Sequence, residues 1–112
     1  MKNMATTPEQ NPRAEVMEVV RQVSRIVRGT LGDPTYRVFL YGSWAAGEAG
    51  ERSDIDIGIE GGSPVPPEAM AAIREACDAL PTLYTIEIVD FVRVPPGFRR
   101  VAQARILEQE AA

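Results

Sequence analysis

Apolar residues recur at intervals of three and four between Ala14 and Arg28, and the charged residues of this stretch fall largely elsewhere. This spacing predicts one amphipathic helix, because positions three and four apart share a face of a helix. The helix is expected to end at GTLGDP, where glycine and proline follow each other closely. Its apolar stripe consists of Val16, Val19, Val20, Val23, Ile26 and Val27.

Three later segments have the composition or the alternation of β-strands. Residues 36–42 (YRVFLYG) are rich in aromatic and β-branched side chains and end at a glycine, which is typical of a buried strand. Residues 53–60 (SDIDIGIE) alternate strictly, with carboxylates and glycine on one face and isoleucines on the other. Residues 84–92 (YTIEIVDFV) alternate again. We therefore expect three strands.

Two further helices are expected after the second and third strands. The loop GGSPVPP ends in two prolines, which suit the first turn of a helix that would stop near Pro81. Residues 95–109 (PPGFRRVAQARILEQ) are expected to form a short final helix. The apolar positions are Met70, Ile73, Cys77 and Leu80 in the first helix and Phe98, Val101, Ala102 and Ile106 in the second.

The predicted order of elements is α-β-(α)-β-α-β-α, which describes one α/β or α+β layer structure. A chain of 112 residues with 45% hydrophobic residues suits a single domain with one modest core. The first dozen residues are polar and contain two prolines. We expect residues 1–10 to form a flexible tail and residues 11–112 to form the single domain.

Charge and residue usage exclude several classes of function. The net charge of -4 would repel a phosphate backbone, so nucleic acid is not the expected partner. No apolar run reaches the roughly 20 residues needed to cross a membrane, and no secretory signal is seen, which favours a cytoplasmic location. Cys77 is the only cysteine and histidine is absent, so serine-histidine triads and histidine-ligated zinc are excluded.

Asp54 and Asp56 lie two positions apart on the second expected strand. Their side chains would point the same way, with α-carbons about 6.6–6.8 Å apart. Carboxylate oxygens suit Mg²⁺, and a pair of such ions stabilises both the attacking and the leaving oxygen of a phosphoryl group. The alternative is that both carboxylates belong to the solvated face of an edge strand.

The turn Gly42-Ser43 ends the preceding strand. Glycine lets the backbone approach an anion, the following turn can present N–H groups to phosphate, and Ser43 adds a hydroxyl donor. Together, the turn and the carboxylate strand predict a phosphate cradle beside a metal site, which is the apparatus of nucleotidyl transfer.

The segment GSWAAGEAGERSDID resembles the G-S-x10-D-x-D signature of the polymerase-β-like nucleotidyltransferases, and ten residues separate Ser43 from Asp54 as in that family. The short chain is similar to the minimal nucleotidyltransferases, and the resemblance covers essentially its whole length. It implies the polymerase-β-like fold, a small mixed β-sheet with helices packed on it. It also implies transfer of a nucleoside monophosphate from ATP or another nucleoside triphosphate to a hydroxyl.

The resemblance further implies the residues of the site. Asp54, Asp56 and Glu87 would hold two Mg²⁺ ions, with Mn²⁺ as an alternative metal. Asp90 is the alternative to Glu87 as third carboxylate, since the two point to opposite faces of their strand. The triphosphate would lie over the Gly42-Ser43 turn.

The chain departs from the family pattern at Trp44 and Ala46, where relatives often carry basic residues. A missing cation would weaken binding of the triphosphate, and Arg52 is the residue that would compensate. Trp44 itself is expected to serve packing more than stacking on a nucleotide.

Minimal family members commonly pair with a helical HEPN-domain protein encoded nearby, as toxin and antitoxin, and add AMP to a tyrosine of that partner. The resemblance therefore implies a HEPN-type partner for this chain. The competing hypothesis is a catalytically weak or inactive antitoxin-like module that neutralises a helical partner by binding. A homodimer is expected to be compatible with both, because a small domain with open strand edges often covers them.

Overall fold

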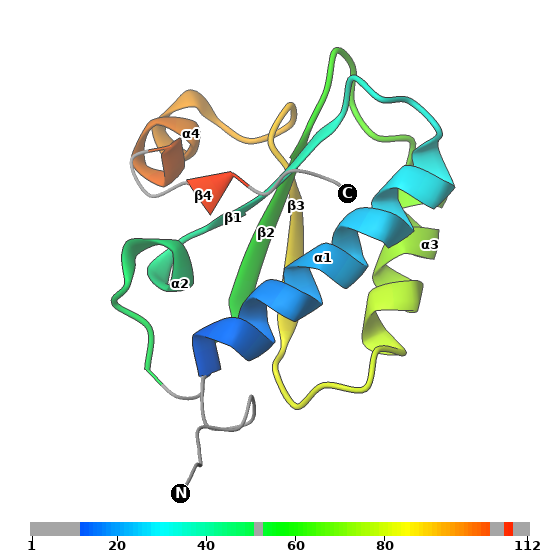
Figure 1. Ribbon diagram of the computed structural model, residues 1–112. Helices are drawn as coiled ribbons and strands as arrows, with labels where there is room; N and C mark the ends of the chain where they lie inside the picture. The colour runs from blue at the N-terminus through cyan, green and yellow to red at the C-terminus, as the bar shows by residue number, and fades with distance from the viewer. Residues whose placement is uncertain (1–11, 51–52, 104–106, 109–112) are drawn as a thin grey trace, which may run out of the picture.

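The computed structural model describes residues 12–50, 53–103 and 107–108 (Figure 1). The expected tail over residues 1–10 lies outside the described residues, and the single-domain boundary stays a prediction. The elements are α1 (Pro12–Leu31), β1 (Arg37–Tyr41), α2 (Ser43–Ala46), β2 (Ile55–Glu60), α3 (Pro67–Asp78), β3 (Ile86–Asp90), α4 (Pro96–Gln103) and β4 (Leu107–Glu108).

The strands form a mixed sheet in the order β3-β2-β1-β4. β1 runs antiparallel to both β2 and β4, whereas β3 runs parallel to β2, to which it is joined through α3. Tyr41 on β1 and Glu87 on β3 are both in register with Asp56 on β2. The predicted fold, a small mixed sheet with helices packed on it, is confirmed.

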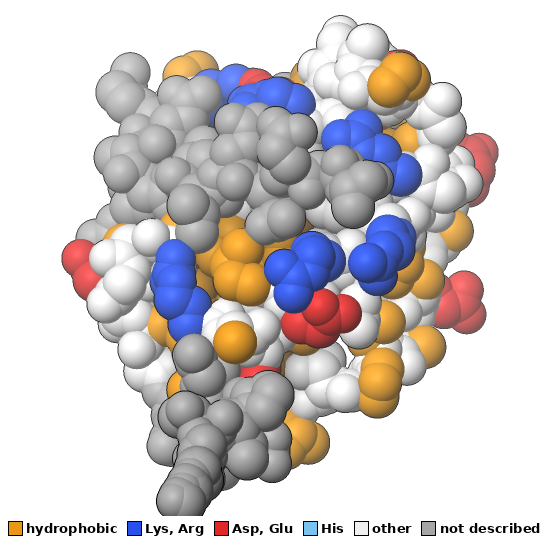
Figure 2. All heavy atoms as spheres, viewed as in Figure 1, with side chains coloured by type: hydrophobic (Ala, Val, Ile, Leu, Met, Phe, Trp, Pro, Cys, Tyr) orange, Lys and Arg blue, Asp and Glu red, His pale blue; other side chains and the backbone are white. Residues whose placement is uncertain are grey.

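Helices α1 and α3 lie side by side on one face of the sheet and enclose the main core (Figure 1). The valine stripe of α1 and the isoleucines of β2 belong to the same core cluster, and Ile55, Ile57 and Ile59 are all 0% exposed. The alternation of β2 and the three-four spacing of α1 therefore have one cause, which is burial in the same core. The outer side of α1 carries basic and acidic side chains close together (Figure 2).

The opposite face of the sheet carries an aromatic cluster made of Phe39, Tyr41 and Phe91, with Phe98 of α4 in edge contact with the last two. The cluster lies over Gly58. A Cβ on Gly58 would overlap the ring of Phe39 and would lie 2.7 Å from the ring of Phe91. Glycine at this position is therefore what lets the two rings pack edge-on with centroids 4.8 Å apart.

The end of the chain differs from the expectation. The helix predicted from residues 95–109 ends at Gln103, and Leu107–Glu108 pairs with β1 as strand β4. The prediction was wrong at Leu107–Glu108, because apolar periodicity does not register the edge of β1, whose backbone groups gain ladder partners from β4. Ile106 lies outside the described residues.

The helix in parentheses in the predicted order corresponds to α2, which was predicted without bounds. Its four residues, Ser43–Ala46, are too few to give a periodic signal. None of the helices in the described ranges is both long enough and apolar enough to cross a bilayer.

Candidate nucleotidyl-transfer site

The candidate site lies at the end of the sheet where β1 finishes and β2 begins. Asp56 stands between its register partners Tyr41 and Glu87, and Asp54 directly precedes β2. Residues in register share a face, and residues two apart on a strand point the same way. Asp54, Asp56 and Glu87, named here the acidic cluster, therefore belong to the face opposite to α1 and α3.

Electrostatic repulsion within the acidic cluster is visible at Asp56. Burial raises the pKa of this half-buried carboxyl, and the charges of Asp54 and Glu87 raise it further. The same two causes act on Tyr41, whose phenol pKa is raised to about 12, first by burial and then by Asp56 and Glu87. A group of carboxylates that repel each other in this way favours a bound cation.

Gly42 packs closely against the carboxylate of Asp56. Its backbone has φ 79° and ψ -152°, a region essentially open to glycine alone. A Cβ at this position would overlap carboxylate oxygen Oδ2 of Asp56 and would lie 3.3 Å from its Cγ. The missing side chain of Gly42 therefore leaves the room that the Asp56 carboxylate occupies.

We expect Gly42→Ala to lower the rate of nucleotidyl transfer about 10- to 50-fold, because the new methyl group would push the Asp56 carboxylate away from its place. Gly47→Ala is the matched control: Gly47 also has a positive φ, of 76°, but a Cβ there would meet no atom within 4 Å. In both variants, backbone strain is expected to lower the free energy of unfolding by about 1–3 kcal/mol, which urea unfolding measures. Equal rates of transfer for the two variants would show that the close packing of Gly42 against Asp56 does not affect catalysis.

Ser43 begins α2 directly after Gly42. The first N–H groups of a helix have no partner within the helix and point outward from its start. A cation also stands near this turn: the Arg13 guanidinium Nη1 donates to the carbonyl of Trp44, with 2.9 Å between nitrogen and oxygen. Sequence reasoning missed Arg13, because 31 positions separate it from Trp44 and no local pattern connects them.

The positions at which the chain departs from the family pattern have different surroundings. Trp44 is 7% exposed and belongs to the main core, so the packing expected of it is confirmed. Ala46 is exposed at the end of α2. Arg52, the residue predicted to compensate for the missing cations, lies outside the described residues.

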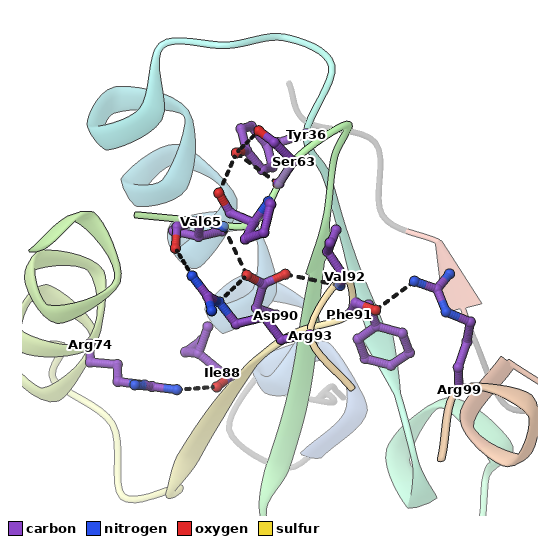
Figure 3. Close-up of polar contacts among 11 residues, drawn as sticks. Tyr36, Ser63, Val65, Arg74, Ile88, Asp90, Phe91, Val92, Arg93 and Arg99 are labelled. Atoms are coloured by element: carbon purple, nitrogen blue, oxygen red, sulfur yellow. Dashed lines mark hydrogen bonds and ion pairs between the residues drawn. The ribbon is translucent and has the colours of Figure 1, made fainter. Parts of the chain in front are cut away.

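Asp90, the alternative third carboxylate, occupies the other side of β3 and is 6% exposed (Figure 3). Its Oδ2 accepts from the N–H of Val65 at 2.8 Å, and its Oδ1 accepts from the N–H of Val92 at 3.0 Å. Arg93 Nε lies 3.3 Å from Oδ2. Asp90 thus holds the loop before α3 against the end of β3, and Glu87 is the carboxylate that the structure brings beside Asp56.

The acidic cluster fits a hard divalent cation by the chemistry of its donors, which are all carboxylate oxygens. Within the described ranges, no group of three or more carboxylate or thiol side chains is already gathered around one point as a metal site. Asp54 and Glu87 are exposed, so changes of rotamer can bring their oxygens toward Asp56. The metal-ligand assignment of Asp54, Asp56 and Glu87 therefore stays a prediction that the placement of the residues supports.

Comparison with known families decides the class of protein. The model of the family described as "Nucleotidyltransferase domain" matches residues 18–109. The chain belongs to this nucleotidyltransferase domain family. The match includes the Gly42-Ser43 turn and the whole acidic cluster of this nucleotidyltransferase, and the predicted family is confirmed. No curated protein matches the chain.

Solved structures share the fold of this nucleotidyltransferase. A toxin-antitoxin with AMP-PNP is 17% identical, with 80% of this chain and 73% of that chain covered and a TM-score of 0.58. A candidate nucleotidyltransferase from Sulfolobus solfataricus is 13% identical, with 96% and 90% covered and a TM-score of 0.58. A tri-AMPylated HEPN toxin with its MNT antitoxin, from Shewanella oneidensis, matches at 14% identity, 93% and 73% coverage and a TM-score of 0.54.

Proposed function

We propose that this protein transfers a nucleoside monophosphate, AMP from ATP, to a hydroxyl group of another protein. The observation that carries the proposal is the contact between Gly42 and Asp56, which places the start of the Gly42-Ser43 turn against the acidic cluster. Transfer of a nucleotide needs both a donor surface for the triphosphate and carboxylates beside it. Membership of the nucleotidyltransferase domain family supports the same class of reaction.

The residues have separate roles in the proposed reaction. The triphosphate lies over Gly42-Ser43, where the Ser43 hydroxyl and the first N–H groups of α2 donate to its oxygens. The guanidinium of Arg13 adds positive charge near α2, where Trp44 and Ala46 supply none. Asp54, Asp56 and Glu87 would hold Mg²⁺ or Mn²⁺, which when bound neutralises phosphate charge and activates the attacking hydroxyl.

The chemical step is a displacement at the α-phosphorus. The acceptor oxygen forms a bond to the α-phosphorus as the bond from that phosphorus to the oxygen bridging to the β-phosphorus breaks. A carboxylate oxygen of Glu87 takes the proton of the hydroxyl, and pyrophosphate leaves. Glu87 suits this role because it is exposed at the edge of the cluster, where a macromolecular hydroxyl can reach it.

A tyrosine of a HEPN-type helical protein is the acceptor that we propose. The support is the fold shared with the MNT antitoxin found in complex with a tri-AMPylated HEPN toxin. The AMP-PNP in the other toxin-antitoxin structure supports ATP as donor. A cytoplasmic location and a homodimer remain predictions of the same proposal.

The decisive experiment is incubation of the purified protein with α-labelled ATP and Mg²⁺, with and without the product of a neighbouring gene that encodes a helical protein. Label is expected on the partner with the wild-type protein and is expected to disappear with Asp54→Asn/Asp56→Asn. Label that persists in the double variant would contradict the proposed site.

The alternative function, a binding module without turnover, is favoured by the absence of a basic side chain at Trp44 and Ala46. It predicts tight binding of the partner with no label under any tested metal or nucleotide. Isothermal titration of Mg²⁺-ATP separates the two functions further, because the inert module would bind no nucleotide.

A further inference from the structure

Trp44, the single tryptophan of the chain, touches more than one of the segments that carry candidate site residues. It directly follows Ser43 in α2 and is 7% exposed. Its indole Nε1 donates to the carbonyl oxygen of Ser53, with 3.0 Å between the two atoms. Because Ser53 directly precedes Asp54, this hydrogen bond joins the end of the phosphate turn to the start of the carboxylate strand.

The third segment of the site meets the same ring. Tyr84 packs edge-on against the indole of Trp44, with ring centroids 5.7 Å apart and an interplanar angle of 88°. Tyr84 leads into β3, and the carbonyl of the next residue, Thr85, accepts from the N–H of Ile55 at 2.9 Å. The indole of Trp44 therefore contacts the chain on the approach to Glu87 as well.

The sheet alone does not fix this geometry. The register of β1 with β2 ends at the pair Tyr41 and Asp56. Ser43 and Asp54 both lie beyond that last pair, and the connection between them includes Gly47 and Gly50, which add backbone freedom. A buried indole has few rotamers and a single donor, so it can hold the two chain segments at one separation.

We propose that Trp44 is a positioning residue that sets Ser43 at a fixed distance from Asp54. The inference rests on the proposed nucleotidyl transfer. A misplacement of about 1 Å between reacting groups can cost about 10²-fold in rate. Loss of the indole hydrogen bond is expected to lower kcat about 10- to 100-fold and to change the KM for ATP less than about threefold, because the turn and the carboxylates still bind separately.

Two variants remove the donor and differ in how much of the ring they keep. Trp44→Phe removes the indole N–H and part of the ring. Because the chain has one tryptophan, growth of a tryptophan auxotroph on β-(3-benzothienyl)alanine replaces Trp44 alone, and that analogue keeps the bicyclic shape with sulfur in place of N–H. The analogue tests the hydrogen bond with the packing against Tyr84 preserved.

Tyr36→Phe is the matched control at the opposite end of the sheet. Tyr36 Oη donates to the carbonyl of Ser63, with 3.0 Å between the two oxygens, so this variant also loses one aromatic donor to a backbone carbonyl (Figure 3). A variant whose only defect is lower stability should behave like Tyr36→Phe. The kcat of Tyr36→Phe should equal that of the wild type at a temperature where circular dichroism shows the variant fully folded.

Amide hydrogen exchange of the nucleotide-free protein gives a second measurement. The N–H of Glu48, bonded to the Ser43 carbonyl at 2.9 Å, and the N–H of Ile55 are expected to exchange faster in the analogue-containing protein and not in Tyr36→Phe. Lowered kcat with faster exchange at these amides supports the inference. Full kcat in both Trp44 variants, beside an inactive Asp54→Asn/Asp56→Asn, overturns it and leaves the proposed function intact. An inactive wild type overturns both.

Discussion

Replacing Glu87 with Gln is expected to lower kcat about 10²- to 10³-fold, because Gln can neither take the proton of the attacking hydroxyl nor ligate a cation as an anion. Glu87 is exposed, so the free energy of unfolding should change by less than about 0.5 kcal/mol. The measurement is transfer of label from α-labelled ATP under single-turnover conditions, together with urea unfolding of each variant.

Two variants serve as comparisons for Glu87→Gln. Glu87→Asp keeps the charge on a shorter arm and should retain part of the rate. Glu75→Gln removes an exposed carboxylate from α3, on the other face of the sheet, and should leave the rate unchanged. A full rate in Glu87→Gln would remove this residue from the acidic cluster's proposed role.

Asp90→Ala is expected to show the opposite pattern, with a loss of about 2–4 kcal/mol in the free energy of unfolding and little change in kcat while the protein is folded. The variant leaves the buried N–H of Val65 without its acceptor and releases the N–H of Val92 and the Arg93 ion pair (Figure 3). Urea unfolding followed by circular dichroism measures the loss.

Asp90→Asn is the graded control, because its side-chain oxygen can still accept one of the two N–H groups. Its loss of stability should fall between those of the wild type and Asp90→Ala. If Asp90→Asn instead lost its transfer rate with unfolding unchanged, Asp90 and not Glu87 would be the third carboxylate. The variants of Glu87 and of Asp90 thus show which of the two residues is the third carboxylate, a choice that alternation along the strand leaves open.

Much of the fold follows from local patterns in the sequence. The stripe of α1 and the alternation of β2 are burial patterns, and the structure buries the valines and isoleucines that they select, apart from Ile26, which is partly buried. Strand β4 was not predictable in the same way, since Leu107 and Glu108 become a strand through pairing with Phe39 and Leu40. Long-range pairing of this kind leaves no periodic signal in a segment of two residues.

The candidate site likewise has residues that local sequence predicts and residues that only long-range pairing brings together. Asp54, Asp56 and the Gly42-Ser43 turn stand close together in the sequence, so their spacing suffices to predict them as one site. The register of β3 places Glu87 opposite Asp56, and no local pattern states that register. The contact of Arg13 with Trp44 depends on how α1 packs beside α2, which is a tertiary property.

The aromatic cluster over Gly58 lies between two charged ends of this face of the sheet. The acidic cluster lies at one end, and at the other Glu60 accepts hydrogen bonds from Arg37 and Arg99, the second of which anchors α4. A hydrocarbon layer screens charges less than water does, and Tyr41 within this layer is affected by the charges of Asp56 and Glu87. Helix α4 meets this layer through the edge contact of Phe98 with Tyr41, so aromatic rings lie between α4 and the carboxylates.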